Sequence, residues 1–225
     1  MLNDINADGK KLTIQPGKKH LILCEGNDDE CFLSCFIKSG VLPEGLVDTV
    51  QVTQAHGVNN LRKMVLALVN ADGFSQLRSL LIIRDADDNI QSAKDSVKGA
   101  FSTANLPVPQ AEYMWEDNSK IKTAFLLMPA CSNISQNGSL DDLCWEILSE
   151  KHGKLIRNEV DGFISSLEVD GKRTYVHRKK ALVRTYFSST EGLITSSIGR
   201  AAEAGAFDWT SEKLYPLREF LKSIF

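Results

Sequence analysis

Two apolar stretches, His20-Leu-Ile-Leu-Cys24 and Leu80-Leu-Ile-Ile83, decide the fold. Each is a short, continuous apolar run that acidic residues follow at once. Two more runs of this kind occupy 50–53 and 124–128, and amphipathic stretches with helical spacing separate the four. Continuous apolar strands joined by helices are typical of a parallel sheet with both faces covered. We therefore expect an α/β fold with a mostly parallel four-stranded sheet flanked by helices.

The chain changes character after residue 139, where helical patterns replace the strands. We expect helices at 140–150, 155–167, 175–187, 198–204 and 214–224. The turns between them are short, which argues against a flexible linker. The sequence thus predicts an α/β core over residues 15–139 and a helical C-terminal extension over 140–225 that packs on the core.

The composition narrows the class of protein. The 225 residues carry a net charge of −3, which excludes a broadly basic nucleic-acid coat but not a local basic groove. No apolar run approaches the ~20 residues of a membrane span, and the polar segment 1–17 lacks the apolar region of a signal peptide. The five cysteines are an odd number without a CxxC pair, so we expect reduced thiols. We expect a cytoplasmic protein with no membrane partner.

Acidic residues gather where two predicted strands end. Glu25 and Asp29 follow the first strand, and we expect Asn27 to cap the next helix with Glu30 completing the capping box. Asp85 and Asp87 follow the third strand, and the alternation of a strand would put them on one side. Ligands of open α/β sheets bind at the carboxyl ends of the strands, so these acids define one candidate site.

Carboxylates brought this close repel one another, and a divalent cation removes the conflict. Mg²⁺ prefers a few carboxylates, retained waters and the phosphate oxygens of a substrate. The pair of acidic groups therefore indicates a site for phosphoryl chemistry that uses Mg²⁺ or Mn²⁺. Taken singly, either group is better explained by helix caps and solvated turns.

Two rival motifs begin at Asp85. An EF-hand loop would need glycine at Ile90 and glutamate at Ser96, so it is excluded. A phosphatase of the haloacid-dehalogenase type would use Asp85 as the nucleophile and Asp87 as the acid. That interpretation leaves Glu25 without a role, and we keep it as an alternative enzyme.

The ordered motifs of the chain resemble the Toprim domain of topoisomerases, DnaG-type primases and overcoming-lysogenization-defect (OLD) nucleases. The whole chain from about residue 18 is similar to small stand-alone bacterial Toprim proteins of unknown function. The matching motifs are Glu25-Gly-x-Asp-Asp-Glu30, Gly57-Val-Asn-Asn-Leu61, Asp85-Ala-Asp87, Leu127-Met-Pro129, Gly138-Ser-Leu-Asp-Asp-Leu143, Lys180-Ala181 and Phe207-Asp-Trp209.

The resemblance implies roles for particular residues. In the nuclease branch, metals bind to a Glu-x-x-x-Asp pair, to DxD and to a later Ser-x-Glu. The first two motifs correspond here to Glu25 with Asp29 and to Asp85 with Asp87. The third corresponds to Asp141, whose side chain is one methylene shorter than glutamate. A downstream lysine stabilises the transition state in that branch; Lys180 is the candidate and Lys179 the alternative.

The run His177-Arg-Lys-Lys-Ala-Leu-Val-Arg184 is the strongest basic feature. On a helix, Lys180 and Arg184 share a face, while Arg178 and Lys179 point elsewhere. The run suits contact with the phosphate backbone of DNA or, equally, a solvated helix. Arg84, just before the DxD motif, could reach a phosphate or pair with an acid.

These features together predict a Mg²⁺- or Mn²⁺-dependent nuclease of the Toprim class that acts on DNA in genome defence or repair. Glu25 and Lys180 would be its catalytic residues. The alternative from another class is a catalytically weak or inactive Toprim module that binds nucleic acid or has a regulatory role and works with an ATPase partner. Either protein could form a homodimer.

Overall fold

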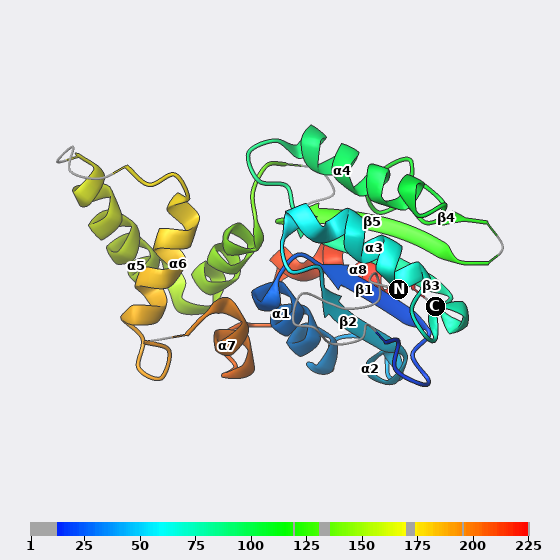
Figure 1. The fold of residues 1–225 in the computed structure, drawn as a ribbon. Coiled ribbons are helices and arrows are strands. Elements are labelled where there is room, and N and C mark those ends of the chain that lie inside the picture. The colour runs from blue at the N-terminus through cyan, green and yellow to red at the C-terminus, as the bar shows by residue number, and fades with distance from the viewer. Residues whose placement is uncertain (1–12, 119, 131–135, 170–173, 195, 225) are drawn as a thin grey trace.

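The computed structural model describes residues 13–118, 120–130, 136–169, 174–194 and 196–224, with the backbone alone for 152–157. Its centre is a twisted sheet with helices on both faces (Figure 1). The expectation about the polar segment 1–17 concerns mostly residues 1–12, which lie outside the described residues. Cys131 also lies outside them. Of the other cysteines, Cys24, Cys31, Cys35 and Cys144 are free thiols.

Five strands form the sheet in the order β2-β1-β3-β5-β4. The strands are β1 (His20–Cys24), β2 (Val50–Gln54), β3 (Ser79–Asp85), β4 (Glu116–Asp117) and β5 (Lys122–Met128). The strands β2, β1, β3 and β5 are parallel to one another, as the sequence predicted. The edge strand β4 is antiparallel to β5 and was not expected, because two residues are too few to give a pattern.

Eight α-helices connect and cover the strands within the described residues. They are α1 (Asn27–Lys38), α2 (Leu46–Thr49), α3 (Leu61–Val69), α4 (Ile90–Thr103), α5 (Leu140–Val169), α6 (Arg178–Ser188), α7 (Ile198–Glu203) and α8 (Tyr215–Lys222). This confirms the mixed α/β class with helices on both faces of a mostly parallel sheet.

The alternation of β-strand side chains divides the core into two layers. Leu21, Leu23, Leu80 and Ile82 pack with α3 and α4 on one face. The strand residues between them, such as Ile22, Leu81 and Ile83, pack on the opposite face with α1, α5, α6, α7 and α8. The C-terminal helices therefore complete one of the two hydrophobic layers of the sheet. The boundary between residues 139 and 140 remains a prediction.

The prediction of two helices at 140–150 and 155–167 was wrong, since α5 runs unbroken from Leu140 to Val169. Gly153 lies inside the helix; glycine weakens a helix by about 1 kcal/mol relative to alanine and does not have to end it. The far half of α5 pairs with α6 in a hairpin that extends away from the sheet (Figure 1). In the described ranges, no helix is long and apolar enough to cross a membrane.

Candidate metal centre

Glu25 and Asp29 lie at the junction of β1 and α1. The helix begins at Asn27 with Gly26 as its N-cap, so the predicted capping by Asn27 and Glu30 was wrong. Instead, Oδ2 of Asp29 accepts a hydrogen bond from the Gly26 backbone N–H at 3.1 Å. Glu30 accepts from the Gln54 side chain at 2.9 Å. The first turn of α1 thus holds Asp29 buried, turned back toward the end of β1.

Asp85 is the last residue of β3, and its Oδ1 accepts a hydrogen bond from the Leu140 backbone N–H at 2.9 Å. Asp87 lies beyond the strand with a φ of 51°, and its backbone pairs with that of Gly138. Strand alternation therefore does not reach Asp87, and the prediction that it shares one side with Asp85 for that reason was wrong. Asp85 points inward, whereas the Asp87 side chain is 56% exposed.

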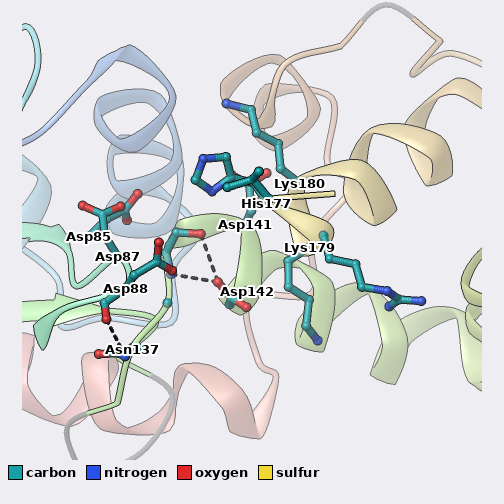
Figure 2. Close-up of a pocket in the computed structure, with 13 residues that line it drawn as sticks. Asp85, Asp87, Asp88, Asn137, Asp141, Asp142, His177, Lys179 and Lys180 are labelled. Carbon is teal, nitrogen blue, oxygen red and sulfur yellow. Dashed lines mark hydrogen bonds between the residues drawn. The ribbon is translucent and has the colours of Figure 1, made fainter. Parts of the chain in front are cut away.

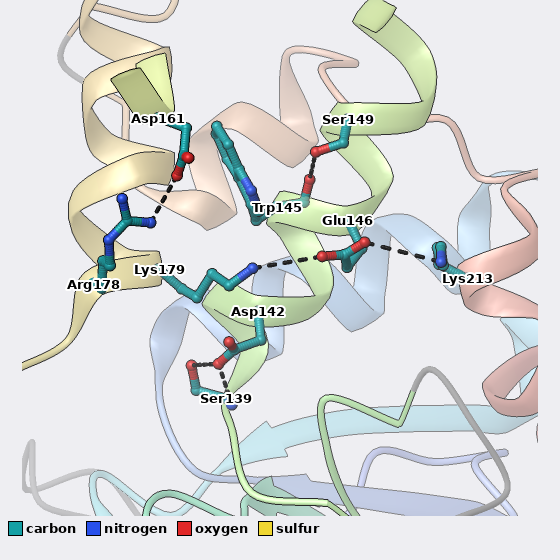
Figure 3. A network of polar contacts seen from close by, with 9 residues as sticks. All are labelled: Ser139, Asp142, Trp145, Glu146, Ser149, Asp161, Arg178, Lys179 and Lys213. Atoms are coloured by element: carbon teal, nitrogen blue, oxygen red, sulfur yellow. Dashed lines mark hydrogen bonds and ion pairs between the residues drawn. The ribbon is translucent and has the colours of Figure 1, made fainter. Parts of the chain in front are cut away.

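Asp141 enters the same region from the first turn of α5. Its neighbour Asp142 acts as the cap of the helix, because its Oδ2 accepts from both the backbone N–H and the hydroxyl of Ser139 (Figure 3). Asp141 itself is half-buried, and its Oδ1 is buried without a hydrogen-bond partner among the described residues. The hydrogen bond from Leu140 to Asp85 brings this helix start against the end of β3.

The electrostatics join Glu25, Asp29 and Asp85 into one group, which we call the acidic triad. Burial, and next the charge of Glu25, raises the pKa of Asp29 to about 7. Burial and the charges of Asp29 and Glu25 raise the pKa of Asp85 well above its usual range, although the Leu140 N–H opposes this. Burial also raises the pKa of Glu25, against the nearby positive charge of Arg84. Burial is the largest cause for all three members, and the charge of Glu25 adds to it for both Asp29 and Asp85.

Asp141 lies beside the triad. Burial raises its pKa, while the positive charges of Lys180 and Arg184 lower it. The buried thiol of Cys144, one turn along α5, links the two parts of the site. Burial raises its pKa, and so do the negative charges of Asp141, Asp29 and Asp85, which all lie close to this one sulfur.

The donor set fits a divalent cation. Within the described residues, three buried carboxylate oxygens have no hydrogen-bond partner: Oε2 of Glu25, Oδ1 of Asp29 and Oδ1 of Asp141. A buried charged oxygen without a partner is costly, and carboxylate oxygens are the ligands that Mg²⁺ prefers. Across the same residues, no group of three or more acidic, thiol or imidazole side chains is placed so that it could hold a metal ion without rearrangement. Side-chain rotations would have to bring the oxygens together on an ion.

An open cavity of about 460 Å³ lies beside these acids. Asp85, Asp87 and Asp141 line one part, and residues 176–180, at the start of α6, line another (Figure 2). The cavity is therefore acidic at the sheet edge and basic at the helix pair. It has room for a phosphate group between the two.

The basic residues of α6 have different partners. Arg178 forms ion pairs with Asp161 at 2.7 Å and Glu168 at 3.0 Å. Lys179 pairs with Glu146 at 3.5 Å, one turn along α5 from Asp142 (Figure 3). Lys180 is exposed, and no ion pair within 4.0 Å involves it among the described residues. Of the two candidate lysines, Lys180 is the one whose charge acts on Asp141.

Asp28 links three helices, a role that was not predicted from the sequence. It accepts hydrogen bonds from Arg184 at 3.2 Å and from the Gly199 backbone N–H at 3.0 Å, which ties α1 to α6 and α7. Burial would raise the pKa of Asp28, but the bonds from Gly199 and Ser197 and the charge of Arg184 hold it below its usual range. Arg184 shares a helix face with Lys180 in the sequence prediction, but in the structure its guanidinium pairs with Asp28.

Fold and site together define an α/β protein with a cluster of buried carboxylates at the carboxyl edge of a parallel sheet. The chain belongs to the family described as "Protein of unknown function (DUF3226)", whose model matches residues 19–225. Among curated proteins, none matches it.

One solved structure with a similar fold is the C-terminal region of the Xanthomonas campestris pv. campestris OLD protein. It is 14% identical, with 92% of this chain and 93% of that chain covered and a TM-score of 0.42. A likeness this distant does not bear on the chemistry of the site.

Proposed function

We propose that this protein is a metal-dependent phosphodiesterase of the Toprim class that cleaves DNA with Mg²⁺ or Mn²⁺. The observation that supports it most is the set of three buried carboxylate oxygens without a hydrogen-bond partner in the described residues, on Glu25, Asp29 and Asp141. The order of the Toprim-like motifs along the chain agrees with this proposal.

The carboxylates of the acidic triad and Asp141 would hold the ion, with Asp87 at the outer margin of the site. A bound divalent ion would supply a more acidic water and neutralise charge on a phosphate. The residues of the chain would do the rest. Lys180 would face the scissile phosphate across the cavity and offset its developing charge. The Gly26 N–H would hold the buried Asp29 carboxylate and the Leu140 N–H the half-buried Asp85 carboxylate in a fixed orientation.

The direct test is the nicking of supercoiled plasmid with Mg²⁺ or Mn²⁺ by the purified protein and by Asp85→Asn. The amide keeps an oxygen that can accept from the Leu140 N–H but loses the charge, so we expect the nicking rate to fall by about 10²-fold or more. Asp95→Asn, an exposed change on α4, is the matched control and should keep the rate. Equal nicking by wild type and Asp85→Asn would contradict the proposal.

The regulatory module stays the competing function, because the shortened side chain at Asp141 sets the site apart from the nuclease pattern. The two functions differ in a simple measurement. A protein that binds Mn²⁺ through Asp85 but nicks no DNA supports the module, whereas metal-dependent nicking supports the enzyme. Hydrolysis of a phosphomonoester without any nicking would instead support the dehalogenase-type alternative.

A further inference from the structure

Arg84 is a buried cation inside the acidic edge. It lies on β3, and β1 pairs with β3 in parallel from His20 opposite Ser79 to Leu23 opposite Ile82. Continuing this register by two residues sets Glu25 opposite Arg84, on the face that also carries Leu23 and Ile82. Arg84 therefore approaches the site from the layer opposite to that of Asp85.

The guanidinium of Arg84 is held in place by two acceptors. Its Nε donates to the Asp85 backbone carbonyl at 2.9 Å, and its Nη2 pairs with Oδ2 of Asp87 at 3.3 Å. The side chain is 7% exposed. Its positive charge also acts on Glu25, as the opposing effect on the pKa of that residue shows. A guanidinium does not lose its proton in a protein, so this charge is permanent.

The acids at this edge of the sheet are of two kinds: those that pair with an arginine and those that keep a buried oxygen without a partner in the described residues. Asp87 is paired with Arg84, and Asp28 is paired with Arg184. In the described residues, Glu25, Asp29 and Asp141 instead keep an unpartnered buried oxygen. Asp29 is only 8% exposed, and its charge acts on both Asp85 and Cys144, which places it beside the other acids.

We infer that Arg84 takes the place of a second divalent ion, so that this chain binds one ion through Glu25, Asp29, Asp85 and Asp141 while Asp87 stays paired with Arg84. The inference rests on the proposed function and specifies its metal content. Two-metal sites hold their ions about 4 Å apart between shared carboxylates. A permanent positive charge beside both Glu25 and Asp87 repels a second ion and occupies one of its ligands.

Calorimetric titration of the metal-free protein with Mn²⁺ tests this without any measurement of activity. Wild type should bind about one Mn²⁺ per chain. Asp87→Asn should bind the same amount with an affinity within about threefold, because Asp87 is not a ligand while Arg84 holds it. Asp85→Asn should lose at least about tenfold in affinity. Both variants keep the buried Arg84, so the result does not depend on whether the protein still folds when Arg84 is replaced.

A second set of variants changes Arg84 itself and so removes its buried charge. Arg84→Met keeps much of the side-chain volume, and it should raise the Mn²⁺ stoichiometry to about two by freeing Asp87. Arg84→Lys keeps the charge and should remain at about one ion. The double variant Arg84→Met with Asp87→Asn should return to about one.

The outcomes separate this inference from the proposed function. Two Mn²⁺ ions on wild type, or an affinity lost equally in Asp87→Asn and Asp85→Asn, would overturn the role of Arg84 and leave a metal-dependent enzyme standing. A folded wild type that binds no Mn²⁺ would overturn both. One ion on wild type with the second appearing only in Arg84→Met supports the inference.

Discussion

At the scale of single residues, neighbours in the sequence have opposite environments. Asp28 is paired with Arg184, which favours its charged form, while the adjacent Asp29 is buried among other acids, which favours its neutral form. Asp141 and Asp142 differ in the same way, since Asp142 caps α5 and Asp141 keeps a buried free oxygen. The role of each acid follows from the direction of its side chain, which composition cannot reveal.

Asp29 should make the stability of the metal-free protein depend on pH. Its pKa is about 7 in the folded chain and near 3.8 in the unfolded chain, so the folded state favours the protonated form. The contribution of Asp29 to the free energy of unfolding should therefore be fully present below about pH 4 and be lost as pH rises through about 7. Asp29→Asn removes this loss and should be about 1–3 kcal/mol more stable than wild type at pH 8 in EDTA, by urea denaturation.

Asp28→Asn is the matched control for that measurement, and its effect has the opposite sign. The pKa of Asp28 lies below its usual range in the folded state, so ionisation of this residue stabilises the fold. That stability is present above the unfolded pKa and is lost as pH falls through the folded one. The variant should thus be less stable than wild type at pH 8. Identical urea midpoints for both variants would contradict the assignment of the two environments.

Lys180 and Lys179 form a second matched pair. Lys180→Ala removes the charge that acts on Asp141 from the cavity, and plasmid nicking should slow by about 10²-fold. Lys179→Ala breaks a partly exposed ion pair with Glu146 and should change the rate by less than about threefold. Circular dichroism would check that both variants fold. A larger loss in Lys179→Ala than in Lys180→Ala would exchange their roles.

At the scale of elements, α7 packs closely against α1 through Gly199. A Cβ atom built on Gly199 would lie 2.7 Å from Cβ of Cys31 and 3.3 Å from Oδ1 of Asp28. The first distance is too short for two carbon atoms, so any larger residue must push the helices apart. This contact also keeps the Gly199 N–H at 3.0 Å from Asp28.

Gly199→Ala should therefore destabilise the protein by about 1–3 kcal/mol, since the clash is with a carbon next to the backbone of Cys31. Gly162→Ala in α5 is the control, because no atom lies within 4 Å of the added Cβ and the position is exposed. Alanine is the better helix former there and should add up to about 1 kcal/mol. Urea denaturation measures both, and a stabilised Gly199→Ala would show that the helices are not in close contact.

The elements also show how far the sequence could predict the fold. The strands were placed to within a few residues, because buried apolar runs leave a clear pattern. The continuity of α5 was missed at Gly153, and the cap at Gly26 was missed because its partner Asp29 reaches back from inside the helix. The gathering of Glu25, Asp29 and Asp85 was expected from parallel strands that end together, whereas Asp141 was implied only by the resemblance. Pairing of Arg84 with an acid was one of two alternatives, but the choice of Asp87 and the partner of Arg184 depend on where long side chains turn.

At the scale of the whole molecule, the sheet needs the C-terminal helices to cover one face. Leu217, Phe220 and Leu221 of α8 belong to the same buried layer as Ile22 of β1. Trp115 stacks on Phe220 with ring centroids 5.3 Å apart, and its Nε1–H donates to the Ser223 hydroxyl. The last helix is therefore an integral part of the core.

A fragment of residues 15–139 should consequently lack fixed tertiary structure, although it contains the four parallel strands. It would expose the face that α5 and α8 cover, and exposed apolar surface of this extent favours a molten state or aggregation. Near-ultraviolet circular dichroism and dye binding would show this. A sharp, cooperative unfolding transition of the fragment would instead show that the core folds independently.

The separation of the site along the chain has a consequence for its synthesis. Glu25 and Asp85 emerge from the ribosome well before Asp141 and Lys180, which come from the helices that close the sheet. A nascent or prematurely terminated polypeptide thus carries only part of the proposed catalytic group. Under the proposed function, a nascent chain would gain the ability to cut nucleic acid only after these helices are made, and a chain terminated before them would never gain it.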